Sequence, residues 1–198
     1  MLIMFQRGVT LVELMISVAI VAMLLAMGVP AFSLWIQNTQ NRTAAESILN
    51  GLQLARNEAV KRNTLVRFNL TDTSGLLVWN VGCVNPTTEC PAVIQTRPAE
   101  EGSVNARVGI SNATNPTPAP SDYFATPISA GTGVPSGVSF NSMGRVPDGN
   151  IGTDMLRIDV TNAVASDARR YVVTIGPGGE IRMCDPSLAL ASNPQGCS

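Results

Sequence analysis

The chain has 198 residues, which suits one domain with an appendage and leaves little room for two separate cores. Charged residues make up 14% and the formal net charge is -1, so the composition predicts no general attraction to nucleic acid or anionic lipid. Histidine is absent, which removes the commonest general base and all imidazole metal sites. We therefore expect no enzyme, and we assign no catalytic, cofactor-binding or metal-binding residue.

A long apolar run begins at Val9 and ends at Ile36, and Glu13 is its one charged side chain. The run is long enough to cross a bilayer. A secretory signal peptide would instead have a shorter apolar core followed by a small-residue cleavage site. Because Arg7 precedes the run and the next basic residue is Arg42, the positive-inside rule predicts a cytoplasmic N-terminus with the rest of the chain outside.

The stretch RGVTLVEL, residues 7–14, resembles the prepilin motif of type IV pilins. The resemblance implies that residues 1–8 are a leader peptide cleaved after Gly8, and that Val9 becomes the methylated N-terminus. Pro30 matches a proline that is common in the same helix of the family. Valine after the glycine departs from the more usual phenylalanine or methionine.

Glu13 has an expected role from the same resemblance. An unpaired carboxylate in hydrocarbon costs roughly 2.5 kcal/mol or more. In the family, the matching glutamate is thought to pair with the N-terminal amine of a neighbouring subunit during assembly, which would satisfy the carboxylate. The implied partners are other pilin or pseudopilin subunits, the prepilin peptidase and the inner-membrane assembly platform. The alternative is an ordinary membrane anchor in which Glu13 snorkels to the headgroups.

The helix is expected to continue beyond the apolar run as an amphipathic half, residues 37–63. Its apolar residues recur at three- and four-residue spacing, and Asn63 is a suitable left-handed stop. We therefore predict one helix from Val9 to Arg62, bent at Pro30, with a transmembrane half over residues 9–36. The predicted apolar stripe comprises Ala45, Ile48, Leu52, Ala55 and Ala59.

Two further stretches resemble the GspH/FimT group, which comprises minor pseudopilins of type II secretion and minor pilins of type IV pili. They are LARNEAVKRN at residues 54–63 and FNSMGRVPDG at residues 140–149. The resemblance implies a structural subunit for assembly, initiation or capping of a pilus or pseudopilus. It does not separate the two systems. It places the chain in the inner membrane as a single-pass protein with a periplasmic head, and later in the filament.

The head, residues 64–198, changes to the period of two that is typical of strands. We therefore predict the α+β class, with the long N-terminal helix packed on a mostly antiparallel β-sheet. The resemblance implies that this is a pilin-like fold. The predicted strands lie within residues 64–70, 76–81, 106–111, 137–142, 154–160, 169–176 and 180–184.

Two irregular segments separate the later strands. Residues 112–137 are rich in small residues and proline, and are either flexible or pinned by Tyr123 and Phe124. The stretch VPDGNIGTD contains Asp148, Asn150 and Asp154, which could ligate calcium. A turn between strands explains the same residues and is preferred.

The four cysteines form two local pairs in loop sequence, Cys83 with Cys90 and Cys184 with Cys197. An even number in loops is typical of disulfides formed outside the cytoplasm. Reduced thiols and a zinc site are the alternatives, although the ligand spacing and the lack of histidine disfavour zinc. Three connectivities exist, and the short separations favour local pairing.

A second function also follows from the resemblance, because some minor pilins of this group capture DNA for uptake in natural transformation. They do so through arginines that follow a glycine near the C-terminus. Here Glu180 occupies the place of a first arginine, which leaves Arg182, with Arg169 and Arg170 as neighbours across the sheet. Affinity for phosphate scales with the number of charges neutralised, so the glutamate weakens this alternative.

Overall fold

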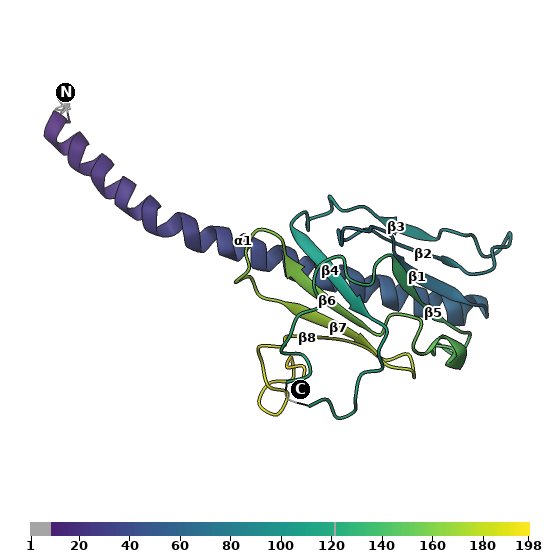
Figure 1. Cartoon of the computed structure of the whole chain (residues 1–198). Helices are drawn as coiled ribbons and strands as arrows, with labels where there is room; N and C mark the ends of the chain where they lie inside the picture. Colours follow the sequence, from purple (N-terminus) through teal and green to yellow (C-terminus); the bar gives the residue numbers. More distant parts are fainter. Residues whose placement is uncertain (1–8, 121) are drawn as a thin grey trace, which may run out of the picture. The chain divides into compact units, whose positions relative to one another are not determined.

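The structure is a computed structural model that describes residues 9–120 and 122–198, without the side chains of residues 27, 28, 30 and 31. The predicted leader, including Gly8, lies outside the described residues. The chain divides into two compact units, one ending at Ile36 and the other comprising Gln37–Ser198. One helix and eight strands follow one another along the described chain (Figure 1).

The helix α1 (Leu11–Arg62) begins two residues later than predicted and ends where predicted. Thr10 forms its N-cap, since its Oγ1 accepts a hydrogen bond of 3.2 Å from the Glu13 N–H. At the other end, Asn63 adopts the left-handed conformation with φ 51°, as expected for the residue that stops the helix. The predicted continuous helix is confirmed.

Within the described part of the chain, no helix is long and apolar enough to qualify as a membrane span. The predicted span, residues 9–36, is not found there and stays a prediction. Pro30 lies inside α1, but its side chain is outside the description, so the bend at this residue also stays a prediction.

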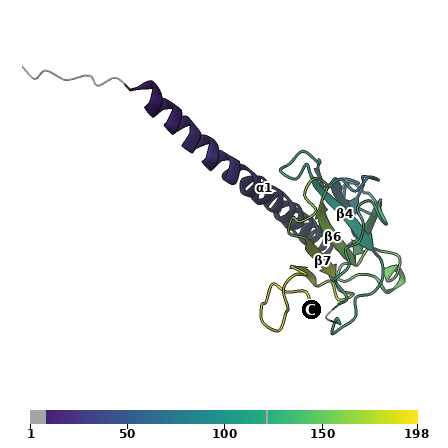
Figure 2. The same ribbon diagram turned by 60° about the vertical axis from the view of Figure 1, so that its left-hand side comes forward.

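The second half of α1 carries the predicted apolar stripe, and each residue of the stripe is fully buried. Strands of both sheets lie along this half of the helix (Figures 1 and 2). Gly51 allows a close approach, because a Cβ there would lie 2.6 Å from the ring of Phe68. The Trp79 indole donates a hydrogen bond of 3.0 Å to the Ser47 hydroxyl, which satisfies its polar atom inside the core.

The head contains two four-stranded antiparallel sheets, where the sequence predicted one sheet. The first has the order β3-β2-β1-β5 and the second the order β4-β6-β7-β8. The strands of the first are β1 (Val66–Leu70), β2 (Trp79–Cys83), β3 (Gln95–Arg97) and β5 (Ser136–Phe140). Those of the second are β4 (Ala106–Ser111), β6 (Arg157–Asn162), β7 (Tyr171–Ile175) and β8 (Ile181–Cys184). The α+β class is confirmed.

The two sheets separate because β1 takes β5 as its second neighbour, whereas β4 pairs with β6. An isolated bridge between Leu76 and Arg107 joins them. The strand β3 was not predicted, since its three residues are polar and two of them are exposed. The 3-10 helix η1 (Asp148–Asn150) fills the predicted turn before β6.

Candidate functional site

Glu13 lies in the first turn of α1 and is exposed. Its backbone N–H completes the N-cap with Thr10, in the spacing Thr-x-x-Glu of a capping box. An acidic residue here also interacts favourably with the positive end of the helix dipole. Among the residues that the structure describes, no cation pairs with its carboxylate.

The two stretches that resemble the GspH/FimT group meet in the structure. The Arg56 Nε donates a hydrogen bond of 3.1 Å to the carbonyl of Gly144. Asn141 shapes that turn, because its Oδ1 accepts the N–H groups of Met143 and Arg145, each at 3.0 Å. Gly179 lies against the same turn, since a Cβ there would be 1.8 Å from the Gly144 oxygen. These motif residues hold the helix to the head.

The end of α1 is fixed to the first disulfide loop. Cys83 and Cys90 are joined, as predicted. Arg62 donates from Nη1 to the carbonyl of Glu89 inside the loop, and from Nε to the Glu58 carboxylate. The hydrogen bond from the Arg62 Nε to the Glu58 carboxylate lowers the pKa of Glu58 below its usual value. The loop therefore serves as an attachment for the helix end.

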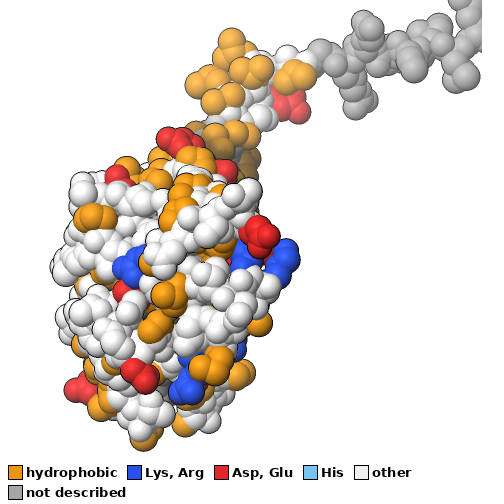
Figure 3. Space-filling view, turned by 90° about the vertical axis from the view of Figure 1, so that its right-hand side faces the viewer, with side chains coloured by type: hydrophobic (Ala, Val, Ile, Leu, Met, Phe, Trp, Pro, Cys, Tyr) orange, Lys and Arg blue, Asp and Glu red, His pale blue; other side chains and the backbone are white. Residues whose placement is uncertain are grey.

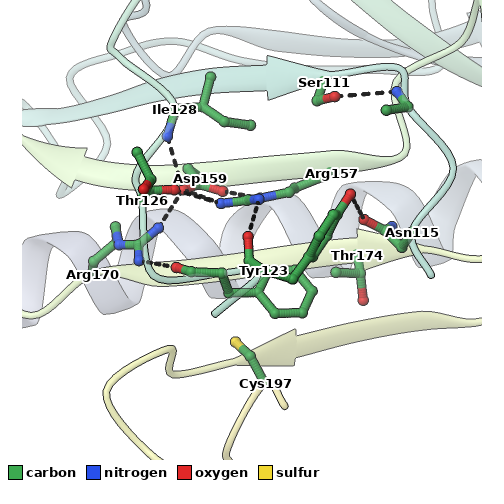
Figure 4. Close-up of polar contacts among 12 residues, drawn as sticks. Ser111, Asn115, Tyr123, Thr126, Ile128, Arg157, Asp159, Arg170, Thr174 and Cys197 are labelled. Atoms are coloured by element: carbon green, nitrogen blue, oxygen red, sulfur yellow. Dashed lines mark hydrogen bonds and ion pairs between the residues drawn. The ribbon is translucent and has the colours of Figure 1, made fainter. Parts of the chain in front are cut away.

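A buried ionic cluster occupies the centre of the second sheet (Figure 4). Asp159 is fully buried and accepts from two arginines, Arg157 on the same strand and Arg170 before β7. The Arg157 Nε lies 2.8 Å from Asp159 Oδ1, and its Nη2 lies 3.0 Å from Oδ2. One carboxylate thus faces two guanidinium groups, which leaves one excess positive charge to be satisfied.

Four consecutive backbone carbonyls satisfy that excess charge. Arg157 donates to the carbonyls of Tyr123 and Thr126, each at 3.0 Å, while Arg170 donates to those of Phe124 and Ala125. The Arg157 guanidinium also lies 5.4 Å from the centroid of the Tyr123 ring and 5.0 Å from that of Phe124. Of the two alternatives for residues 112–137, the pinned loop is the one observed.

Arg182 holds the C-terminal tail. It donates from Nη2 to the carbonyls of Pro194, at 3.3 Å, and of Gly196. The second predicted disulfide joins Cys184 to Cys197 beside this contact. Two of the three arginines considered for DNA, Arg170 and Arg182, are therefore engaged with backbone carbonyls of the head. Arg169 is the exposed member of the three.

The candidate calcium ligand Asp154 has another role. Its Oδ1 lies 2.6 Å from Arg67 Nη1, and its Oδ2 accepts from Ser139 N–H at 2.8 Å and Asn150 Nδ2 at 2.9 Å. Both oxygens are engaged, as expected for a turn between strands, which was the preferred interpretation.

Two features were missed in the sequence, although signals for both are present. The capping box could have been found from the Thr-x-x-Glu spacing at Thr10. The buried cluster could have been found from Arg157 and Asp159, which alternate on a strand and so point to the same face. The contribution of Arg170 had no local signal, since it depends on the pairing of β6 with β7.

Two family models match the chain. The profile of the GspH family, described as type II transport protein GspH, matches residues 44–179, and that of the prokaryotic N-terminal methylation motif matches residues 3–29. The comparison with curated proteins gave no match.

Solved structures of low sequence identity were also found. The type IV minor pilin FimU of Pseudomonas aeruginosa is 16% identical over 79% of this chain and 94% of its own, with a TM-score of 0.49. The minor pseudopilin EpsH of Vibrio cholerae is 12% identical over 75% of this chain and 99% of its own, with a TM-score of 0.47. The family match alone spans more than half of the sequence, and the chain therefore belongs to the GspH family of type II transport proteins, a family of minor pseudopilins and minor pilins.

Proposed function

We propose that the chain is a minor subunit of a type IV pilus or a type II secretion pseudopilus that helps to initiate or cap the fibre. The observation that carries this proposal is the match to the GspH family over residues 44–179, preceded by the methylation motif over residues 3–29. A minor subunit needs one element that joins the filament and a head that stays folded. Here α1 fits the first task, and the head, with its two sheets and two local disulfides, fits the second.

The placement in the cell is a further part of the proposal. Family and motif indicate a membrane-anchored location in the envelope. More specifically, we propose an inner-membrane protein with a cytoplasmic N-terminus and a periplasmic head. A prepilin peptidase would cleave after Gly8, and an assembly platform would add the mature chain to the filament. The two disulfides support a head outside the cytoplasm.

Glu13 provides the proposed assembly contact. Its carboxylate is exposed in the first turn and has no cationic partner among the described residues. A neighbour's positive N-terminal amine would satisfy it within an apolar bundle. DNA uptake is not proposed, because Arg170 and Arg182 donate to carbonyls of the head.

The test is intact-mass analysis of the native protein from membrane and sheared-filament fractions. We expect a mature chain that begins at a methylated Val9 in both fractions, because the peptidase acts before assembly. A mature chain that still contains residues 1–8, or one absent from the filament fraction, would contradict the proposed function.

A further inference from the structure

A cleft of about 520 Å³ opens on the head beside the segment that precedes β7. Its lining includes Asn38 of α1, Asp167 and Arg169 before β7, and Asp185 and Ser187 after β8. Elements distant in sequence therefore meet around one exposed arginine. Contacts from these elements fix both the backbone and the side chain of Arg169.

The backbone of Arg169 is held on both sides by asparagines of α1. The Asn38 Oδ1 accepts its N–H at 2.6 Å, and the Asn41 Nδ2 donates to its carbonyl at 2.9 Å. Asn41 is itself fully buried and accepts a hydrogen bond of 3.0 Å from Asn162 of β6. The position of Arg169 at the cleft is therefore fixed before any partner arrives.

The side chain of Arg169 is oriented by a buried carboxylate. Asp185 is 3% exposed, and its Oδ1 accepts from the N–H and the hydroxyl of Ser187, at 2.8 and 2.6 Å. Its Oδ2 accepts no hydrogen bond from any described residue and lies 3.3 Å from the Arg169 Nε. The Asp185 carboxylate thus occupies the Nε side of the Arg169 guanidinium.

The outer side of the same guanidinium remains open. The Arg169 side chain is 55% exposed, and its two Nη nitrogens donate to no residue in the described chain. These nitrogens form a planar fork that matches the two oxygens of a carboxylate. Because the backbone and Nε are already fixed, a second carboxylate would bind with little further loss of side-chain entropy.

We propose that this cleft is a docking site in which Arg169 receives an aspartate or glutamate side chain of a neighbouring subunit in the filament. The proposal rests on the proposed function, since it requires a neighbour. Asp167, exposed at the rim of the cleft, gives the surface an alternating pattern of charge. A complementary segment of the neighbour would place a carboxylate opposite Arg169 and a cation opposite Asp167. These two contacts would fix the position of the segment along the cleft.

A protein carboxylate fits the site better than a nucleic-acid backbone does. Phosphate binding gains affinity from each additional phosphate that is neutralised. Here Arg170 and Arg182 are engaged with the head, and the exposed Asp167 would repel a polyanion. On the face seen in Figure 3, Lys and Arg side chains are scattered among Asp and Glu and form no continuous basic surface.

The experiment uses the full chain in cells that assemble the filament. Arg169→Gln removes the fork, and Arg145→Gln is the matched control, because Arg145 is also exposed but does not line the cleft. We expect Arg169→Gln to lower the amount in the sheared-filament fraction by about tenfold at an unchanged membrane level. The control should match the wild type.

A second variant identifies the partner group. Arg169→Lys places an amine at the cleft, and a zero-length carbodiimide joins an amine to a carboxylate in direct contact. We expect a cross-link from position 169 to an aspartate or glutamate of a neighbouring subunit. The wild type provides the background, since Lys61 is its single lysine and a guanidinium does not react.

The outcomes separate the alternatives. Wild-type incorporation by Arg169→Gln overturns the docking proposal and leaves the proposed function intact. A loss of incorporation with a lowered unfolding temperature and no cross-link also overturns it, because Arg169 would then be structural. A DNA mobility shift that is lost in Arg169→Gln, with normal incorporation, overturns it in favour of phosphate binding. Absence of the wild type itself from filaments would refute the proposed function, and the docking site with it.

Discussion

Arg56 of α1 and Gly144 of the turn after β5 are joined by a hydrogen bond of 3.1 Å from the guanidinium Nε to the carbonyl oxygen. The contact links the two stretches of sequence that resemble the GspH/FimT group, both of which lie within the family match over residues 44–179. Gly179 packs against the same carbonyl from the turn between β7 and β8. Arg56, Gly144 and Gly179 therefore lie together at the junction of the helix with both sheets.

Gly179→Ala is expected to destabilise the head by at least about 2 kcal/mol. Gly179 has φ 83°, and an added Cβ would lie 1.8 Å from a backbone oxygen, so the turn must move. Gly149→Ala is the control, because a Cβ there would have no neighbour within 4 Å. Urea unfolding of both variants measures the difference. Equal stability would mean that the turn does not pack as described.

Asp159→Asn is expected to lower the free energy of unfolding by about 3–5 kcal/mol, because two guanidinium groups would lose their shared carboxylate. The control is Glu46→Gln, which breaks an exposed pair with Arg42 and should have a much smaller effect, because solvent screens such a pair. Thermal or urea unfolding checks both. A neutral Asp159→Asn would show that the four carbonyls suffice to hold the arginines.

Asp72 should contribute to stability in a pH-dependent way. The Ser74 hydroxyl donates to Asp72 Oδ1 at 2.6 Å, and the N–H groups of Leu76 and Ser74 do so at 2.8 and 2.9 Å. These bonds hold the pKa of Asp72 below its usual value of 3.8. The stabilisation is therefore fully present above that pH and is lost as the pH falls through the lowered folded-state pKa.

Asp72→Asn should consequently weaken the acid dependence of the unfolding free energy below about pH 4. Ser74→Ala removes the strongest donor and should have an intermediate effect. The measurement is urea unfolding as a function of pH. An unchanged slope in Asp72→Asn would contradict the role given to this turn.

Glu13→Ala should leave the membrane level of the protein unchanged and lower its amount in sheared filaments. The substitution removes the least favourable side chain from the apolar run and also removes the proposed partner of a neighbour's amine. Thr10→Val is a useful comparison, because it removes the N-cap hydroxyl and keeps the carboxylate. Quantitative immunoblots of the membrane and sheared-filament fractions measure both amounts. Equal incorporation of Glu13→Ala and wild type would exclude an assembly role for the carboxylate.

Loss of the second disulfide should act mainly on the C-terminal tail. The bridge joins cysteines with a sequence separation of 13. Its loss should lower the free energy of unfolding by at most about 3 kcal/mol. Cys184→Ser with Cys197→Ser should speed amide exchange in residues 185–197 more than in β7. Arg182 would still hold the tail through two carbonyls. Equal acceleration in β7 would show that the bridge stabilises the whole sheet.

The elements most accessible from the sequence were those with a strong local period. The stripe from Ala45 to Ala59 and the stop at Asn63 were predicted because burial and backbone conformation there depend on neighbours along the helix. The disulfides followed from their short separations. By contrast, the division into two sheets depends on which distant strand pairs with β1, and nothing within that strand specifies it.

The surroundings of the arginines could not be predicted for the same reason. Arg170 and Arg182 were considered for DNA binding because of the resemblance to DNA-capturing minor pilins, which says nothing of what their side chains contact in this chain. Apart from Asp159, which pairs with Arg170, their partners are the carbonyls of residues 124, 125, 194 and 196, and any residue type supplies a carbonyl. Contacts to main-chain carbonyls therefore cannot be predicted from the pattern of residue types.

The hydrogen bonds from Arg157 and Arg170 to the carbonyls of residues 123–126 have a consequence for substitutions in this loop. Because Arg157 and Arg170 bind main-chain oxygens there, replacing Ala125 or Thr126 leaves those acceptors in place. The exposed side chains of this loop can therefore be replaced while its anchorage stays constant. A filament system could in this way change the surface that one minor subunit shows to its surroundings without redesigning the sheet beneath.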